Sequence, residues 1–123
     1  METINKDTIQ TLSMTRGDTI PYHFQRKDNA GKPILTEAEK IYFTVKDTDL
    51  QQPVVLQKTI EDMTFDETGT YHFTIYPEDT NNLTYGTYTY DVEVRIESDN
   101  YTRTISKGIF ELTDESTWAS NEV

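Results

Sequence analysis

The sequence predicts an all-β protein, an antiparallel β-sandwich of about seven strands. Apolar residues alternate with polar ones in several short segments, which is the pattern of strands with one buried face. Eight Tyr and five Phe, together with many Thr, favour strands over helices. Clusters of Gly, Asp, Asn and Pro separate these segments and predict turns between neighbouring strands.

The clearest strand covers residues 87–96. Its apolar face carries Tyr88, Tyr90, Val92, Val94 and Ile96, and the residues between them are polar. Shorter alternating segments predict the remaining strands, at 8–14 (an edge strand), 20–25, 41–46, a weaker segment around Val54 and Leu56, 71–76, and 101–112. Gly108, inside the last segment, predicts a bulge or a bend.

Two pieces between the strands predict single helical turns, at residues 36–40 and 77–83. In the second piece, Pro77 suits the first turn of a helix and the acidic residues that follow it suit a helix N-terminus.

No internal domain boundary is apparent. We therefore expect a single domain over residues 1–123, with its core at about 8–113 and a C-terminal tail at 114–123. Trp118 in that tail either folds back on the sandwich or contacts a partner.

The composition excludes several kinds of site. The chain has no Cys, which excludes disulfides and thiolate metal sites and favours folding in a reducing cytosol. No apolar run approaches the roughly 20 residues that span a bilayer, so we expect no membrane insertion. The first residues also lack the basic and then apolar pattern of a signal peptide.

The net charge of −11 is uneven along the chain. Residues 1–58 hold 8 acidic and 8 basic residues, a net charge of 0, whereas residues 59–123 hold 14 acidic and 3 basic residues, a net charge of −11. Because an acidic surface repels phosphates, we expect neither nucleic acid nor anionic lipid as a partner. We interpret the acidic half as a solvated face, and an acidic patch that docks a basic partner is the alternative.

The segment LTYGTYTYDV, residues 83–92, resembles the corner that leads into strand F of immunoglobulin-like domains, where a Gly precedes a Tyr. The resemblance implies an immunoglobulin-like sandwich in which Tyr88 is the corner tyrosine and its hydroxyl bonds to nearby backbone. Tyr90 stands where antibody domains have a Cys, which places the chain outside the true antibody domains.

Four longer segments extend the resemblance: LSMTRGDTIPYHF, IYFTVKD, GTYHFTIYPEDTNNLTYGTYTYDVEV and TISKGIFEL. Together they resemble immunoglobulin-like structural proteins of phages and prophages of Gram-positive bacteria, in particular the N-terminal domain of the phage baseplate upper protein. The resemblance covers roughly residues 10–113 and rests on strand and turn residues. It implies a structural module of a tail, a baseplate or a head decoration, without an active site.

The segment TRGDT, residues 15–19, contains Arg-Gly-Asp, a tripeptide that engages adhesion receptors in some extracellular proteins. Gly17 supplies backbone freedom for a tight corner, and Asp18 can bond backbone amides in a turn. The related phage proteins commonly have a Gly-Asp pair just before the first long core strand. We therefore interpret the segment as a turn that opens a strand.

The sequence predicts no catalytic residues, no cofactor site and no metal site. His23 and His72 fall on the outward faces of their strands, without a spacing that supports zinc. Calcium is the alternative for the acidic turns, but their spacing matches no known calcium loop, and acids in turns commonly serve the backbone. These acids are Asp47 and Asp49 in one turn, and Asp62, Asp66 and Glu67 in another.

Three functions remain open. The favoured hypothesis is a non-enzymatic virion structural or assembly protein, made in the bacterial cytoplasm, that contacts other virion proteins or copies of itself and takes no small-molecule substrate. The alternative is a cell-surface adhesion or carbohydrate-binding module that uses the exposed tyrosines Tyr42, Tyr76 and Tyr85. An enzyme is least favoured, since no acid, base and nucleophile converge in the sequence.

Overall fold

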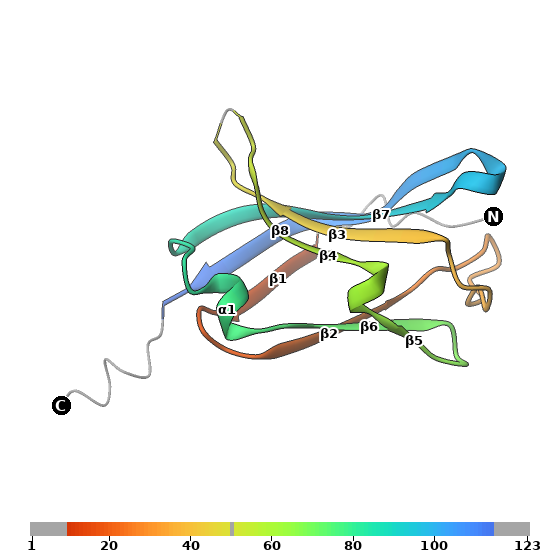
Figure 1. The fold of residues 1–123 in the computed structure, drawn as a ribbon, viewed down its shortest axis with the longest axis horizontal. Coiled ribbons are helices and arrows are strands. Elements are labelled where there is room, and N and C mark those ends of the chain that lie inside the picture. Colours follow the sequence, from red (N-terminus) through yellow and green to blue (C-terminus); the bar gives the residue numbers. More distant parts are fainter. Residues whose placement is uncertain (1–9, 50, 115–123) are drawn as a thin grey trace.

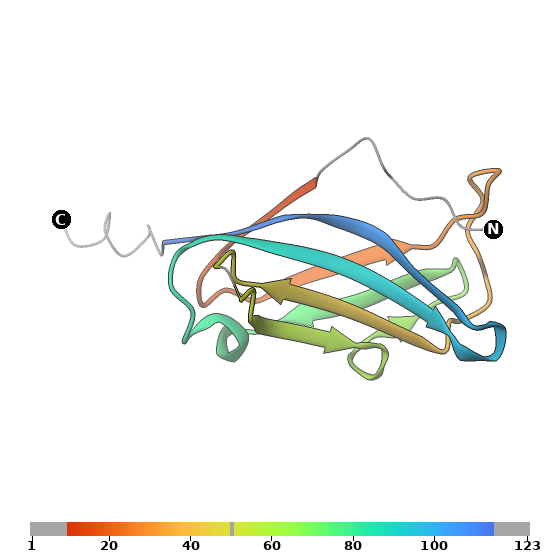
Figure 2. The same ribbon diagram turned by 90° about the horizontal axis from the view of Figure 1, so that it is seen from above.

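The computed structural model describes residues 10–49 and 51–114. Two β-sheets lie face to face and form a sandwich (Figures 1 and 2). The larger sheet has five strands in the order β1-β8-β7-β3-β4, and the smaller has three in the order β2-β6-β5. All neighbouring strands are antiparallel except β1 and β8, which run parallel. The predicted all-β, immunoglobulin-like sandwich is therefore confirmed, and the parallel pairing of β1 with β8 departs from the antiparallel arrangement that the sequence predicts.

Eight strands form within residues 10–49 and 51–114, one more than the sequence predicts. The additional strand is β5, a two-residue strand that pairs with β6 and is too short to show an alternating pattern. The elements in chain order are β1 (Gln10–Thr15), β2 (Ile20–Gln25), β3 (Lys40–Lys46), β4 (Val54–Thr59), η1 (Ile60–Asp62), β5 (Thr64–Phe65), β6 (Thr70–Ile75), α1 (Pro77–Thr80), β7 (Gly86–Ile96), η2 (Glu97–Asp99) and β8 (Tyr101–Thr113).

The core lies between the two sheets, where the inward faces of the alternating strands meet. On β7, Tyr88, Tyr90, Val92 and Val94 are all buried, as the alternation predicts. Phe43 of β3 bridges the sheets, since its ring centroid lies 4.8 Å from that of Phe73 on β6. The buried apolar residues are Met14, Ala38, Ile41, Phe43, Val45, Leu56, Tyr71, Phe73, Ile75, Tyr88, Tyr90, Val92, Val94, Ile105, Phe110 and Leu112.

The bulge predicted in the last strand exists, but Gly108 is not the bulged residue. Gly108 pairs in register with Tyr90 of β7, and the register shifts instead where Val92 faces Ser106 and Glu93 faces Thr104. Ile105 is the extra residue, and it is buried. Because of the bulge, β8 buries both Ile105 and Phe110, although their sequence separation is odd.

The helical turn predicted at 77–83 forms as α1, with Pro77 as its first residue. The carboxylate of Asp79 accepts a hydrogen bond from the backbone N–H of Tyr76 at 2.8 Å, which caps the turn. The helical turn predicted at 36–40 is wrong. There the backbone N–H of Ala38 donates to the hydroxyl of Tyr71 at 2.9 Å, which ties this non-helical segment to β6.

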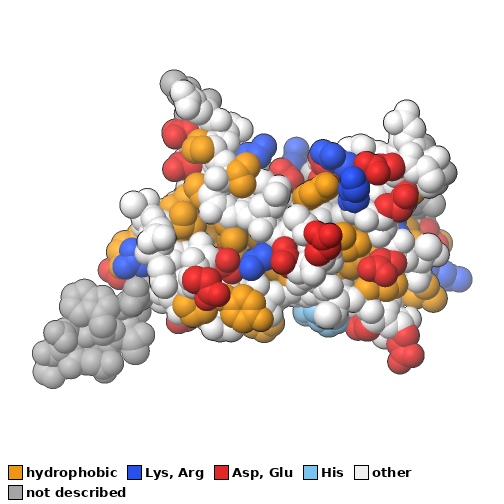
Figure 3. All heavy atoms as spheres, in the orientation of Figure 1, with side chains coloured by type: hydrophobic (Ala, Val, Ile, Leu, Met, Phe, Trp, Pro, Cys, Tyr) orange, Lys and Arg blue, Asp and Glu red, His pale blue; other side chains and the backbone are white. Residues whose placement is uncertain are grey.

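Within residues 10–49 and 51–114, no helix has the length and apolar character to cross a bilayer. Trp118 and most of the predicted tail lie outside the described residues. Acidic side chains on the face seen in Figure 3 are scattered among basic, apolar and neutral groups and form no continuous patch there.

Candidate functional site

The TRGDT segment is a turn between β1 and β2. The backbone N–H of Asp18 donates to the carbonyl of Thr15 at 3.1 Å, and Gly17 has a φ of +89°, a conformation that favours glycine. The N–H of Gly17 donates to the hydroxyl of the fully buried Thr80, which ties the turn to α1.

The arginine of the tripeptide is held by the protein itself. The guanidinium of Arg16 lies 4.4 Å from the ring centroid of Tyr85 and donates to the carbonyl of Leu83 at 3.3 Å. These contacts bind the arginine to the loop before β7. The turn that the sequence predicts is present, as the bond from Asp18 to Thr15 and the φ of Gly17 show.

Tyr88 forms the tyrosine corner that the immunoglobulin resemblance implies. Its hydroxyl donates to the carbonyl of Thr84 at 2.6 Å, and its ring is buried. The hydrogen bond fixes the loop that leads into β7, and it therefore serves the fold rather than a ligand.

The two histidines lie side by side on the outer face of the smaller sheet. His23 of β2 pairs with His72 of β6, and their ring centroids are 5.9 Å apart. Both are exposed, as the sequence predicts. Nε2 of His72 lies 2.9 Å from Oδ2 of Asp66.

The acidic turns use their carboxylates to organise the backbone. Asp66 accepts hydrogen bonds from the backbone N–H groups of Thr68 and Thr70 and from the hydroxyl of Thr68. The hydroxyl of Thr68 and the ring of His72 hold the pKa of Asp66 well below its usual range. Asp49 and Asp62 bond backbone N–H groups in the same way. Among the described residues, no three His, Cys, Asp or Glu side chains come together as metal ligands.

The three tyrosines that the sequence predicts to be exposed have different neighbours. Each ring lies near the cation of a different residue. Tyr85 packs under Arg16, as described above. Tyr76 lies near Lys58, with 5.5 Å between Nζ and the ring centroid. Tyr42 lies under Arg95, with 5.1 Å between Cζ and the ring centroid. Only Tyr42 lines a hollow on the face of the larger sheet.

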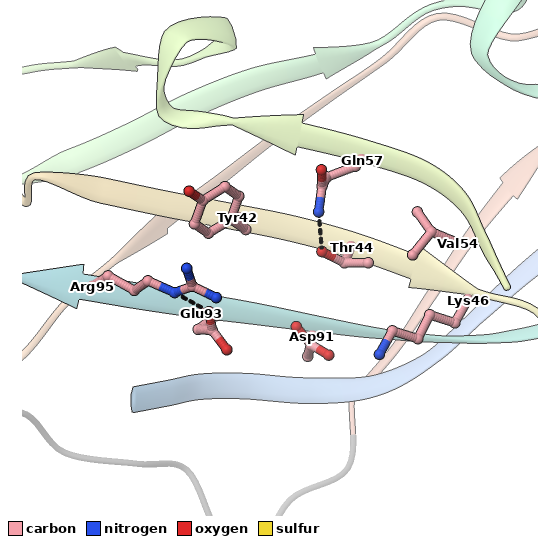
Figure 4. A pocket seen from close by; sticks show the side chains of 8 residues that line it. All are labelled: Tyr42, Thr44, Lys46, Val54, Gln57, Asp91, Glu93 and Arg95. Carbon is pink, nitrogen blue, oxygen red and sulfur yellow. Dashed lines mark hydrogen bonds and ion pairs between the residues drawn. The ribbon is translucent and has the colours of Figure 1, made fainter. Parts of the chain in front are cut away.

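That hollow opens on the outer face of β3, β4 and β7 and has a volume of about 380 Å³. Figure 4 shows side chains from the three strands projecting into it. The strand register brings them together, because Thr44 of β3 pairs with Gln57 of β4 on one side and with Asp91 of β7 on the other. The lining residues are Tyr42, Thr44, Lys46, Val54, Gln57, Asp91, Glu93 and Arg95.

Polar contacts fix several of these side chains. Nε2 of Gln57 donates to Oγ1 of Thr44 at 3.0 Å, and Nε of Arg95 donates to Oε1 of Glu93 at 2.7 Å. Asp91 is half-buried, and this desolvation raises its pKa, although the ammonium of Lys46 acts in the opposite direction. Sequence reasoning singled out Tyr42 alone of this group, because the other members come together only through strand pairing.

Among the solved structures compared, the Lin-41 filamin domain supports the fold, and two others are similar at a lower level. The Lin-41 filamin domain matches with a TM-score of 0.53 and 18% identity over 91% of each chain. CopC from Methylosinus trichosporium OB3b matches with a TM-score of 0.49 and 12% identity over 85% of each chain. The NK cell receptor Nkp44 gives 0.48 and 16%, over 87% of this chain and 100% of that one. The search of curated proteins finds no match.

A family model described as FctA, the Spy0128-like isopeptide containing domain, matches residues 6–120. An isopeptide bond of this kind joins a lysine amine to the side-chain carbonyl of Asn or Asp. Every lysine and asparagine whose surroundings are described is exposed or only partly buried. The buried residues where β1 and β8 lie side by side are apolar, and they are Met14, Phe110 and Leu112.

A lysine and a carboxylate do meet at the open side of the sandwich. Nζ of Lys58 lies 2.8 Å from Oδ2 of Asp79, with side-chain exposures of 12% and 20%. The contact is an ion pair that ties β4 to α1, and the same oxygen accepts the N–H of Tyr76 and caps α1. Because no described lysine or asparagine is fully buried, the described residues do not fit an isopeptide bond buried in the core. With its sandwich fold and its match over residues 6–120, the chain belongs to the family of Spy0128-like isopeptide containing domains, and its described core is held by apolar packing.

Proposed function

We propose that this chain is a non-enzymatic structural domain that acts through protein–protein contacts in a multi-copy assembly, and that this assembly is a phage or prophage virion. The match of residues 6–120 to a family of immunoglobulin-like, pilin-type domains carries the first part of the proposal. Domains of this kind typically serve as structural or surface modules, and their fold is typically non-enzymatic.

The edges of the two sheets differ in how well they could pair with a strand of another protein. Pro21 in β2 and the two-residue length of β5 blunt both edges of the smaller sheet. At the β4 edge of the larger sheet, the register shifts between Val45 and Lys46. The β1 edge has six residues paired in unbroken register with β8. It is therefore the edge best suited to pair with another copy or another virion protein.

The virion part of the proposal rests on the resemblance of four strand and turn segments to structural proteins of phages and prophages of Gram-positive bacteria. These segments include β6 and β7, which supply much of the core. The resemblance to the baseplate upper protein makes a tail or baseplate the preferred location.

Fractionation of an induced culture tests this proposal. Prophage induction in the bacterium that encodes the chain, followed by gradient purification, separates virions from cell envelope and cytosol. Immunogold labelling with an antibody to the chain is expected to decorate purified particles at one fixed place. Label on the cell envelope and none on particles would overturn the virion assignment and favour a surface protein.

A further inference from the structure

The hollow on the outer face of β3, β4 and β7 has the chemical composition of a binding site. Its side chains supply an aromatic ring (Tyr42), two carboxylates (Asp91 and Glu93), an amide (Gln57) and a guanidinium (Arg95). Donors and acceptors thus surround one ring within a hollow of about 380 Å³, near the lower end of the size range of small-ligand sites.

The charges of this hollow cancel. Asp91 and Glu93 are balanced by Lys46 and Arg95, although the chain as a whole has a net charge of −11. A ligand of high charge of either sign therefore gains little net attraction here. The lining also contains little purely aliphatic surface, since Val54 is its only aliphatic side chain. These properties favour a neutral and strongly polar ligand.

Several groups are already fixed in position. The hydroxyl of Thr44 holds the amide of Gln57, and the carboxylate of Glu93 holds the guanidinium of Arg95 over the ring of Tyr42. Thr44 has only 6% of its surface exposed, although it lies on the outer face of the sheet, because its neighbours surround it. Groups held in this way lose little conformational entropy when a ligand binds.

Asp91 is a carboxylate whose charged form is opposed by burial, and the ammonium of Lys46 acts against this effect. Asp91 is half-buried on a strand whose outer positions could hold threonine, and burial raises its pKa. A carboxylate kept in a partly desolvated position costs stability, and such groups are concentrated at binding sites. A ligand hydroxyl that donates to this carboxylate would replace the water that Asp91 has lost.

We propose that this hollow binds a neutral saccharide, with its hydroxyl groups bonded by Asp91, Gln57 and Arg95 and its C–H face packed against the ring of Tyr42. Sugar hydroxyls both donate and accept hydrogen bonds, which matches the mixture of carboxylate, amide and guanidinium in this hollow. The aromatic ring supplies apolar contact for the carbon skeleton. This proposal is independent of the virion proposal, because it concerns one site on the domain in any location.

The test uses the full chain on an array of neutral and acidic oligosaccharides. The tightest neutral oligosaccharide is then titrated into the isotopically labelled protein and followed by NMR. We expect saturable binding, with chemical-shift changes centred on Tyr42, Thr44, Gln57 and Asp91. No binding to any neutral oligosaccharide, or binding to acidic ones alone, would overturn the proposal.

Two substitutions locate the site. Asp91→Asn keeps the shape of the side chain and removes its charge, and we expect at least about a tenfold loss of affinity from the lost charged acceptor. Since burial of Asp91 opposes its charge, this variant is expected to be as stable as the parent chain or more stable, which separates lost binding from lost folding.

Tyr42→Ala is the second substitution, and it removes the packing surface. Tyr85→Ala is its matched control, because Tyr85 is exposed and also packs against an arginine but lies outside the hollow. The control is expected to bind as the parent chain does. Unchanged affinity in both Asp91→Asn and Tyr42→Ala would refute the site.

Discussion

Removal of the Tyr71 hydroxyl tests how the loop before β3 is held. The ring of Tyr71 is fully buried, and its hydroxyl accepts the backbone N–H of Ala38, a residue with only 6% exposure. Tyr71→Phe keeps the ring contacts with Phe24 and Phe65 and leaves a buried N–H without its acceptor. An orphaned buried donor costs about 1–3 kcal/mol, so this variant is expected to lose that much free energy of unfolding.

The matched comparison is Tyr88→Phe, which removes the hydrogen bond of the tyrosine corner. Thr84, whose carbonyl accepts that bond, is exposed, so water can replace the lost donor. The expected loss is about 0.5–1.5 kcal/mol, smaller than that of Tyr71→Phe. Equilibrium unfolding in urea measures both values. An equal or larger loss in Tyr88→Phe would refute the argument that solvent access decides the cost.

Three further predictions follow from single features of the fold. Gly69→Ala is expected to cost about 1–3 kcal/mol in urea unfolding, because Gly69 has a φ of +83° and a new Cβ would lie 2.9 Å from a backbone oxygen. Gly31→Ala, at a φ of +81° but with open space around it, is expected to cost less, and the reverse order would contradict the steric reasoning. The hydroxyl of Thr68 and the ring of His72 lower the pKa of Asp66 in the folded protein. The charged carboxylate therefore stabilises the fold above about pH 4, the pKa of an Asp in an unfolded chain, and this stabilisation is lost as the pH falls further. The unfolding temperature of Asp66→Asn is therefore expected to fall less than that of the parent chain as the pH is lowered below about 4. An equal fall in the two proteins would count against this role of Asp66. The intact mass of the purified chain is expected to equal that of the linear chain, the sum of its residue masses plus one water, whereas a mass lower than this by one ammonia or one water would reveal an isopeptide bond.

Much of the fold could be predicted from the sequence, because the strands carry their own pattern. The alternation in β7 and the Gly-Thr-Tyr segment at its start predict a half-buried strand and its tyrosine corner, and both are present. The strand β5 could not be predicted, since two residues become a strand only by pairing with β6. The helical turn at 36–40 was wrong because a tertiary hydrogen bond from Ala38 to Tyr71 outweighs local propensity.

The candidate site could be predicted only in part. The alternating pattern places Tyr42 on the outward face of its strand and so identifies it as a candidate. Gln57 and Asp91 look like ordinary outward polar residues in the same kind of pattern. Their convergence depends on the register of β3 with β4 and β7, which sets Thr44 opposite both of them. Register depends on contacts far apart in the sequence, and no local pattern encodes it.

A count of copies per virion is the most direct test of the account. Quantitative mass spectrometry on purified particles measures the ratio of this chain to the other virion proteins. A structural domain of a symmetric assembly predicts a fixed ratio, a whole multiple set by the symmetry of the tail, baseplate or capsid. Absence of the chain from particles, or a ratio that varies between preparations, would contradict a structural role in the virion.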